Sequence, residues 1–388
     1  MKKERSIFLT ILAIFMFSLC NANALPSESS ESPFPGKIAI ITNAADQNDE
    51  EVLAAIQIIK KYGAEKILHY EWPANFMEGQ VQMGDIMLEI AANKDIKAVL
   101  INQAVFNTNR SIDKLRGIRK DIYVVCCEPS ENVLDAAARA DLILIQNHMN
   151  TGPAIAMQVK KQGAQTLVHY SFPRHMSNTA LASRRDQMRE VCKELGINFV
   201  DAMAPDPTSN VGLSGARQFI YEDVPKKIAE YGKDTAFFST NCGMQEPLIK
   251  AVFDNRGIFP QPCCPSPNHG FPEALGIKSR SSNGLKDISY VISETKRIIE
   301  EHGLTGRFST WPVPVSMVFT NTAVEYIIKW LNSEVPDETI DKAQLLKASE
   351  DYVKSVTGTT GSVDLTQYYE NNINYPNVYM LSLDYLTY

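Results

Sequence analysis

Several apolar runs of this sequence are followed by side chains that suit the recognition of a small molecule. Amides and carboxylates fix hydrogen bonds in definite directions, aromatic rings offer flat apolar walls, and arginine offers a planar fork for anionic groups. The candidate ligand-binding residues are Asn43, Asp46, Trp72, Gln103, Glu128, Asn147, His148, Tyr170, Phe172, Arg184 and Asn241. This mixture of residue types predicts binding rather than catalysis.

Each candidate also has a structural interpretation that involves no ligand. Trp72 and Phe172 could equally belong to a hydrophobic core. Asn43 and Asn147 could cap helices or shape turns, which is a common use of asparagine. Glu128 precedes a proline and could simply end a strand. Both interpretations stay open at the level of sequence.

Motifs that would indicate an enzyme are missing from the sequence. It contains no G-x-S-x-G, Walker, G-x-G-x-x-G or H-E-x-x-H pattern, and no local signature marks a nucleophilic cysteine. No C-x-x-C pair and no closely spaced cysteine–histidine set indicates zinc. We therefore expect no catalytic activity, no cofactor and no metal.

The cysteines allow two interpretations. The chain has seven, including the adjacent pairs Cys126–Cys127 and Cys263–Cys264. Neighbouring residues on a strand point to opposite faces, so Cys126 and Cys127 are not expected to bridge each other. An exported protein could join Cys242 to Cys263 or Cys264. The alternative, which we favour, is that the cysteines are buried free thiols that behave as small apolar residues.

Two octapeptides one hundred residues apart indicate how the candidate residues are positioned. "KILHYEWP" (66–73) and "TLVHYSFP" (166–173) are both apolar runs that end in His-Tyr, an intervening residue, an aromatic residue and proline. His69 and His169 lie inside these runs, and we interpret both as core histidines.

Similar apolar runs alternate with helical patterns from "KIAIIT" (37–42) onward, and the alternation restarts near residue 151. This alternation predicts two parallel sheets flanked by helices. The helix predicted near residues 215–232 is interrupted in this interpretation by Pro225.

The N-terminus has the composition of a targeting segment. A basic start, a long apolar run and the small residues Ala22–Ala24 predict a signal peptide over 1–24, followed by a flexible Ser/Glu/Pro-rich tether over 25–35. A transmembrane anchor is one alternative, although the run is short for a span of roughly 20 residues. Lipidation of Cys20 is another, although Leu19 stands where a small residue is usual. We therefore expect an exported protein, in the periplasm or at the extracellular face of the membrane, with a lipid anchor at Cys20 as the alternative.

Length and charge exclude some classes of function. The 388 residues suffice for two domains, and the apolar content of 44% and charged content of 21% are ordinary for a globular protein. The formal net charge of −7 argues against nucleic-acid binding, which usually requires a basic surface.

Three segments resemble one known family. They are "NTGPAIAMQVKKQG" (150–163), "SRRDQMREVCKELGI" (183–197) and "FFSTNCGMQEPLIKAVFDNRGI" (237–258). In this order they resemble the second half of the type I periplasmic-binding-protein superfamily, which includes sugar-binding proteins and the ligand domains of lactose-repressor-like regulators. The resemblance covers roughly Gly36 to Asn332.

The resemblance implies an α/β fold of two similar lobes. The N-terminal lobe would comprise 36–148 plus about 305–332, and the C-terminal lobe 149–304. Crossovers are expected near 148–151, 271–278 and 305–314. The remaining residues, 333–388, form a C-terminal extension that the sequence does not place.

The resemblance also implies a function. An extracytoplasmic solute-binding protein would capture a small molecule between its lobes for an ABC-type transporter or a membrane receptor. Arg184 matches a ligand arginine of the family, whereas Cys242 replaces a usual aspartate. That replacement disfavours a simple hexose, so we expect an aromatic or nucleoside-like ligand.

Two other functions are kept as alternatives. One is a surface lipoprotein with a role in adhesion, for which the Tyr-rich tail would be the feature to test. The other is a ligand-sensing domain that shares only its fold with transcriptional regulators, because no basic recognition helix precedes the lobes.

Overall fold

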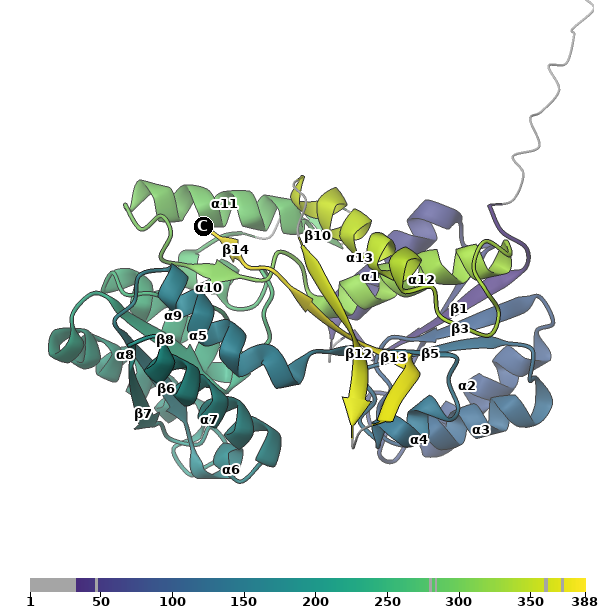
Figure 1. Ribbon diagram of the computed structural model, residues 1–388, viewed down its shortest axis with the longest axis horizontal. Helices are drawn as coiled ribbons and strands as arrows, with labels where there is room; N and C mark the ends of the chain where they lie inside the picture. The colour runs from purple at the N-terminus through teal and green to yellow at the C-terminus, as the bar shows by residue number, and fades with distance from the viewer. Residues whose placement is uncertain (1–32, 46–47, 279–280, 283–284, 359–361, 371–372) are drawn as a thin grey trace, which may run out of the picture. The chain divides into compact units, whose positions relative to one another are not determined.

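The computed structural model describes residues 33–45, 48–278, 281–282, 285–358, 362–370 and 373–388 (Figure 1). The predicted signal peptide, Cys20, most of the predicted tether and Asp46 lie outside these residues. Among the described residues, no helix is both long enough and apolar enough to cross a membrane. The residues from Phe34 to Tyr388 belong to one unit, whose sheets and helices follow.

The first sheet combines strands from both ends of the chain. Its order is β12-β13-β5-β4-β3-β1-β2. The strands are β1 (Lys37–Thr42), β2 (Ile67–Glu71), β3 (Ile96–Ile101), β4 (Tyr123–Cys127), β5 (Leu142–Gln146), β12 (Val363–Glu370) and β13 (Ile373–Leu383). Strands β1 to β5 are parallel, β13 is parallel to β5, and β12 is antiparallel to β13.

Helices cover both faces of the first sheet, which explains why a strand such as β1 is apolar along almost its whole length. One face packs against α1 (Asp49–Tyr62), α12 (Val315–Leu331) and α13 (Lys342–Thr357). The other face packs against α2 (Gln80–Ala92), α3 (Thr108–Ile118) and α4 (Val133–Ala137).

The second sheet has the order β7-β6-β8, and all three strands are parallel. These are β6 (Thr166–Ser171), β7 (Asn198–Met203) and β8 (Thr235–Ser239). Single parallel bridges, Ala236 to Ile258 and Phe259 to Phe308, extend the pairing beyond β8.

Helices also cover both faces of the second sheet. One face packs against α5 (Thr151–Lys161) and α7 (Thr179–Glu194). The other packs against α8 (Gly212–Tyr231), α9 (Gln245–Asp254), α10 (Phe271–Leu275) and α11 (Ile288–Glu301). The shorter elements are η1 (His148–Asn150), α6 (Pro173–Met176), η2 (Cys242–Met244), β9 (Ser281–Ser282), β10 (Leu285–Lys286), β11 (Ser309–Thr310) and β14 (Leu386–Thr387).

The C-terminal tail contributes to both sheets' cores. Its strands β12 and β13 extend the first sheet next to β5, and their side chains Leu365 and Leu381 are buried in that core. The tail then pairs through β14 with β11, and Tyr388 is buried in the core of the second sheet. Figure 1 shows this yellow segment reaching from one sheet to the other. The passage at 383–386 is a connection that the sequence did not predict.

These sheets confirm the predicted fold class. Parallel strands alternate with helices in both halves, and each sheet is flanked by helices on its two faces. One local prediction was wrong, because α8 continues through Pro225. The proline removes the hydrogen bond to the carbonyl of Tyr221, and that residue is exposed, so water can serve as its partner.

Candidate functional site: a polar cavity at the carboxyl ends of the first sheet

A cavity of about 410 Å³ lies at the carboxyl ends of β3, β4 and β5. Its remaining wall comes from the starts of α1 and α12 and from the segment 264–269, which follows the second sheet. Its lining residues are Asn48, Asp49, Glu50, Asn102, Gln103, Glu128, Gln146, Cys264, Pro265, Ser266, Asn268, His269, Pro314, Val315, Ser316 and Phe319. Open α/β sheets bind ligands at this edge, and the volume falls within the usual range of roughly 300–1,000 Å³.

Asn102, directly after β3, presents an unused acceptor. Its Nδ2 donates to Thr320 Oγ1 at 2.6 Å and to the carbonyl of Ser316 at 3.2 Å. These bonds fix the amide against α12. Its Oδ1 is buried and has no hydrogen-bond partner among the described residues. A buried acceptor without a partner is uncommon in folded proteins and marks this position for explanation.

Glu128 follows β4 in a strained backbone conformation. Its φ of 44° lies in the left-handed region, which costs a residue other than glycine roughly 1–3 kcal/mol. Its carboxylate accepts a hydrogen bond from the backbone N–H of Gln146, and its Oε2 lies 3.1 Å from Nε2 of His148. These two contacts therefore hold the Glu128 carboxylate at the carboxyl ends of β4 and β5.

The segment 264–269 supplies the opposite wall and two further unused polar atoms. Ser266 donates from Oγ to Oε1 of Glu50 at 2.7 Å, which ties the segment to α1. The backbone N–H of Asn268 donates to Ser266 Oγ at 3.1 Å. Both polar atoms of the Asn268 side chain are buried and lack a hydrogen-bond partner among the described residues. The wall of the cavity thus contains an amide whose donor and acceptor both lack a partner among the described residues.

Two of the predicted site residues line this cavity and one lies beside it. Gln103 and Glu128 are lining residues, and His148 is joined to Glu128. Desolvation acts to lower the pKa of His148, but the hydrogen bond and charge of Glu128 outweigh it, so the pKa is raised. His148 and Arg184 also border a neighbouring cavity of about 450 Å³.

The predicted asparagines lie outside the cavity. Asn147 caps η1, with its Oδ1 accepting from Asn150 N at 3.2 Å, so the capping interpretation is confirmed there. Asn241 accepts from Gly243 N at 2.9 Å and caps η2. Asn43 is buried after β1, and its backbone N–H donates to Oε2 of Glu51 at 2.8 Å. Ligand contact by these three residues stays a prediction.

The predicted aromatic residues are buried. Trp72 packs in the core of the first sheet and donates from Nε1 to the carbonyl of Gln103 at 3.2 Å. Tyr170 packs in the core of the second sheet and donates to Asp223 at 2.8 Å. Phe172 is buried in the same core and borders a cavity of about 280 Å³. None of the three lines the 410 Å³ cavity, and their contact with a ligand stays a prediction.

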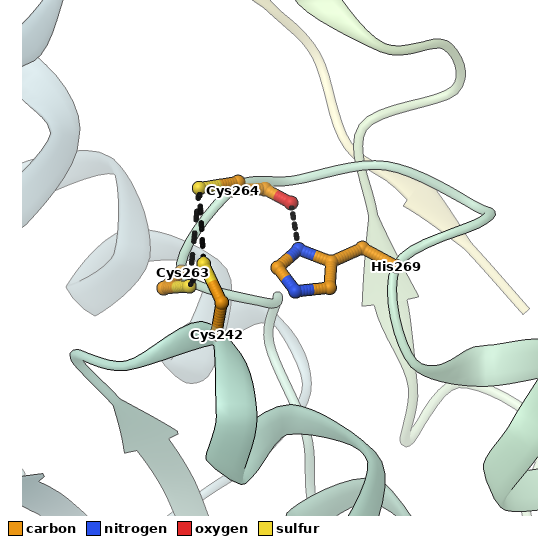
Figure 2. Close-up of side chains that lie close together, drawn as sticks. All are labelled: Cys242, Cys263, Cys264 and His269. Carbon is orange, nitrogen blue, oxygen red and sulfur yellow. Dashed lines mark hydrogen bonds between the residues drawn. The ribbon is translucent and has the colours of Figure 1, made fainter. Parts of the chain in front are cut away.

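Sequence reasoning missed a cluster of sulfur and imidazole groups beside the cavity. The ligand atoms of Cys242, Cys263, Cys264 and His269 all lie within 4.8 Å of one another (Figure 2). Cys264 and His269 also line the cavity. The signal in the sequence was the run "CCPSPNH" (263–269) after one strand-like segment and Cys242 after another. Only the pairing of β8 with the segment at 258 brings the two together.

Arg184 lies close enough to this cluster to interact with its charge. Burial lowers the pKa of Arg184, while the cysteines Cys263 and Cys264 act to raise it. Its guanidinium stacks over Phe238 at 5.2 Å. Its Nε is buried without a hydrogen-bond partner among the described residues. The cluster therefore has a cation beside it that can offset negative charge on sulfur.

The topology defines the fold class of this chain. Two helix-flanked sheets of mostly parallel strands form the α/β architecture that the sequence predicted. A solved structure from Clostridium difficile 630, described provisionally as a transcriptional regulator, has the same fold. It is 20% identical, with a TM-score of 0.81, and the match covers 92% of this chain and 99% of that one.

Within that class, the chain belongs to the family described as "Protein of unknown function (DUF3798)", whose model matches residues 36–309. Two uncharacterised proteins of Treponema pallidum (strain Nichols) are similar to part of it. One is 36% identical over 173 residues, which cover 45% of this chain and 80% of that protein. The other is 32% identical over 176 residues, which cover 44% and 80%.

Proposed function

We propose that the protein is an extracytoplasmic solute-binding protein that holds a small molecule in the 410 Å³ cavity. The observation that carries the proposal is the set of unused amide atoms in its wall: Oδ1 of Asn102 and both polar atoms of Asn268. Leaving such groups buried and unpaired costs roughly 1–3 kcal/mol each. A ligand with donors and acceptors would remove this cost and so bind in a fixed orientation.

The wall composition favours a ring with polar edges. Pro265, Val315 and Phe319 supply apolar surface, while the amides and Glu128 supply hydrogen-bonding groups. An asparagine amide pairs well with the edge of a heterocycle because it offers a donor and an acceptor side by side. We therefore keep the nucleoside-like or aromatic ligand as the proposed class, with plain sugars as the alternative.

Ligand capture would involve both sheets. Asn102, Gln103 and Glu128 come from the first sheet, whereas Ser266 and Asn268 come from the segment that follows the second. A ligand that contacts both groups would favour a closed arrangement, which is the usual basis of hinge closure. The predicted leader over 1–24 supports export and delivery to an ABC-type permease or a membrane receptor. Lipidation at Cys20 would tether the same binding unit to the membrane.

A thermal-shift screen of residues 25–388 against nucleosides, flavins, sugars, amino acids and peptides tests the proposal. Ligand at about 100 times its Kd stabilises the native state by about 2.7 kcal/mol, so a binder raises the Tm. In Asn268→Ala, affinity should fall by about 10- to 100-fold, because one amide pairing is lost. Asn268→Ala should not lower stability, since its side chain has no partner among the described residues.

The matched control is Asn198→Ala, an exposed asparagine at the start of β7. Its Tm shifts should equal those of the wild type. A ligand whose Tm shift survives both Asn268→Ala and Gln103→Ala binds elsewhere, and would show that this cavity is not the site. A shift produced by plain sugars but by no ring-bearing ligand would refute the proposed ligand class alone.

A further inference from the structure

The three sulfur atoms of the cluster have the spacing of a metal coordination shell. The Sγ atoms of Cys242 and Cys263 are 3.2 Å apart, those of Cys242 and Cys264 3.7 Å, and those of Cys263 and Cys264 3.9 Å. Zinc–sulfur bonds of about 2.3 Å at tetrahedral angles place sulfurs about 3.8 Å apart. The sulfurs therefore already form one face of such a tetrahedron, and His269 supplies a nitrogen within 4.8 Å of them.

One ring nitrogen of His269 is held by a backbone carbonyl of the same segment. Its Nδ1 lies 2.8 Å from the backbone carbonyl of Cys264 (Figure 2). Since a carbonyl can only accept, Nδ1 carries the proton and donates it, which leaves the lone pair on Nε2. A hydrogen bond from the non-ligating ring nitrogen to a backbone carbonyl is typical of zinc-bound histidine.

The backbone around the cluster is restricted before any ion binds. Four prolines, Pro260, Pro262, Pro265 and Pro267, surround Cys263 and Cys264, and each fixes its own φ. Cys242 begins η2 directly after the Asn241 cap. Little conformational freedom remains to be lost when the three thiols converge, which favours binding.

The charges near the cluster also balance. Three thiolates and one neutral imidazole around a divalent ion give a net charge of −1, and the buried guanidinium of Arg184 lies close enough to interact with Cys263 and Cys264. The cation of Arg184 would therefore offset the net negative charge of such a complex.

A disulfide is the competing fate of these thiols. Cys242 could pair with Cys263 or Cys264, but pairing uses two sulfurs and leaves the third unpaired beside the ligand cavity. The other described cysteines, Cys126, Cys127 and Cys192, are buried elsewhere in the two cores. A single ion uses all three sulfurs and the histidine together.

We propose that Cys242, Cys263, Cys264 and His269 form a closed, four-coordinate site for a thiophilic metal ion, with zinc(II) as the occupant. Soft thiolate and imidazole donors in tetrahedral array select zinc over magnesium or calcium. The site would tie the segment 263–269 to η2 and so fix one wall of the 410 Å³ cavity. It stands on the cluster alone and does not depend on the proposed solute.

Cobalt(II) and zinc(II) titrations of reduced, chelator-treated residues 25–388 test the proposal. One equivalent of cobalt should give the thiolate charge-transfer band and the visible bands of tetrahedral cobalt, and zinc should displace it. Zinc affinity, measured by competition with a chromophoric chelator, should fall more than ~100-fold in Cys242→Ala, because loss of an outer-shell partner alone costs 10- to 100-fold. His269→Ala should weaken zinc binding and shift the visible cobalt bands, because water replaces the imidazole as the fourth ligand.

Two variants serve as matched controls. Cys192→Ala removes a buried thiol from α7, and His302→Ala removes another histidine whose Nδ1 donates to a backbone carbonyl. Both should keep wild-type zinc affinity. The proposal fails if the reduced wild type gives no charge-transfer band, or if Cys242→Ala binds zinc as tightly as the wild type. If the variants do not fold, the wild-type cobalt spectrum decides by itself.

Discussion

The two strands that carry the same His-Tyr sequence occupy different places in their sheets. Among the described strands, β2 lies at an edge and pairs with β1 alone, whereas β6 lies between β7 and β8. In β2, His69 is partly exposed and its Nε2 lies 2.9 Å from Thr42 Oγ1. In β6, His169 is fully buried, and its Nδ1 lies 3.0 Å from Asp201.

The tyrosines that follow the two histidines also differ in burial. Tyr70 on β2 is only partly buried and donates to Glu89 at 3.2 Å, whereas Tyr170 on β6 is fully buried. The shared sequence therefore marks a common place in a strand–helix repeat rather than a repeated ligand contact. The groups suited to ligand binding lie beyond the strand ends, where the two halves of the sequence do not resemble each other.

The largest expected difference between the two strands is the cost of removing their tyrosines. Tyr170→Ala should lower the free energy of unfolding by about 3–5 kcal/mol, because a fully buried aromatic side chain leaves a cavity. Tyr70→Ala should cost about 1 kcal/mol or less, since its ring already contacts water. Urea unfolding followed by far-UV circular dichroism measures both values.

Tyr170→Phe separates packing from hydrogen bonding in this test. It keeps the ring but removes the bond to Asp223, a partly exposed carboxylate that water can reach, so we expect a loss of about 1–2 kcal/mol. Equal losses for Tyr70→Ala and Tyr170→Ala would show that position in the sheet does not govern the role of the motif.

Most of the fold could be predicted because each strand and helix shows its own pattern of apolar residues within a short segment. The first predicted strand, 37–42, coincides with β1, and the alternation of apolar runs with helical patterns gave the class. The tail could not be placed, because β13 pairs with β5, more than two hundred residues earlier in the chain. Such pairing depends on distant segments and leaves no periodic pattern near the tail. The lobe bounds 36–148, 149–304 and 305–332 stay predictions.

The candidate site was less predictable for the same reason. The rule that ligands lie at strand ends led to Gln103 and Glu128, which line the cavity. It could not identify Asn268, whose importance lies in two unpaired atoms that only the folded structure shows. The Cys242–Cys263 approach likewise spans a strand, a helix and a loop. Our expectation of no closely spaced cysteine–histidine set overlooked the run from Cys263 to His269, to which the fold adds Cys242.

Buried ionisable groups distinguish the two sheets further, beginning with Glu51 on α1 beside the first sheet. Burial raises the pKa of Glu51 to about 7, although bonds from Asn43 N and Asn48 Nδ2 act to lower it. The folded protein therefore holds this proton more tightly than the unfolded chain does. Stability attributable to Glu51 is present at low pH and is lost as pH rises from about 4.5 to about 7.

Glu51→Gln should remove that loss. Between pH 5 and pH 8 the free energy of unfolding should fall by about 3 kcal/mol more in the wild type than in the variant. This follows from about 1.4 kcal/mol for each unit by which folding raises the pKa of Glu51. Unfolding free energies at several pH values measure this. Glu78→Gln makes the same substitution at an exposed glutamate and serves as the control. Parallel curves for wild type and Glu51→Gln would contradict the prediction.

His169 should make stability depend on pH in the opposite direction to Glu51, and by a smaller amount. Burial lowers the pKa of His169, although its bond to Asp201 acts to raise it, and its Nε2 is buried with no partner among the described residues. The neutral ring is therefore the folded form, with Nδ1 donating to Asp201. The unfolded chain takes up a proton near pH 6.5, so stability is present above that pH and is lost as pH falls below it.

His169→Asn keeps a donor in the place of Nδ1 but cannot titrate, so the decline in stability from pH 7 to pH 5 should become shallower. His69→Gln keeps a group in the place of Nε2 and should flatten the decline less, because His69 is partly exposed. Measuring both in a Glu51→Gln background removes the opposing titration from the same pH range. If the two variants changed the slope of unfolding free energy against pH equally, the edge histidine and the central histidine would contribute equally to the pH dependence. The distinction between the strands would then depend on Tyr170 alone.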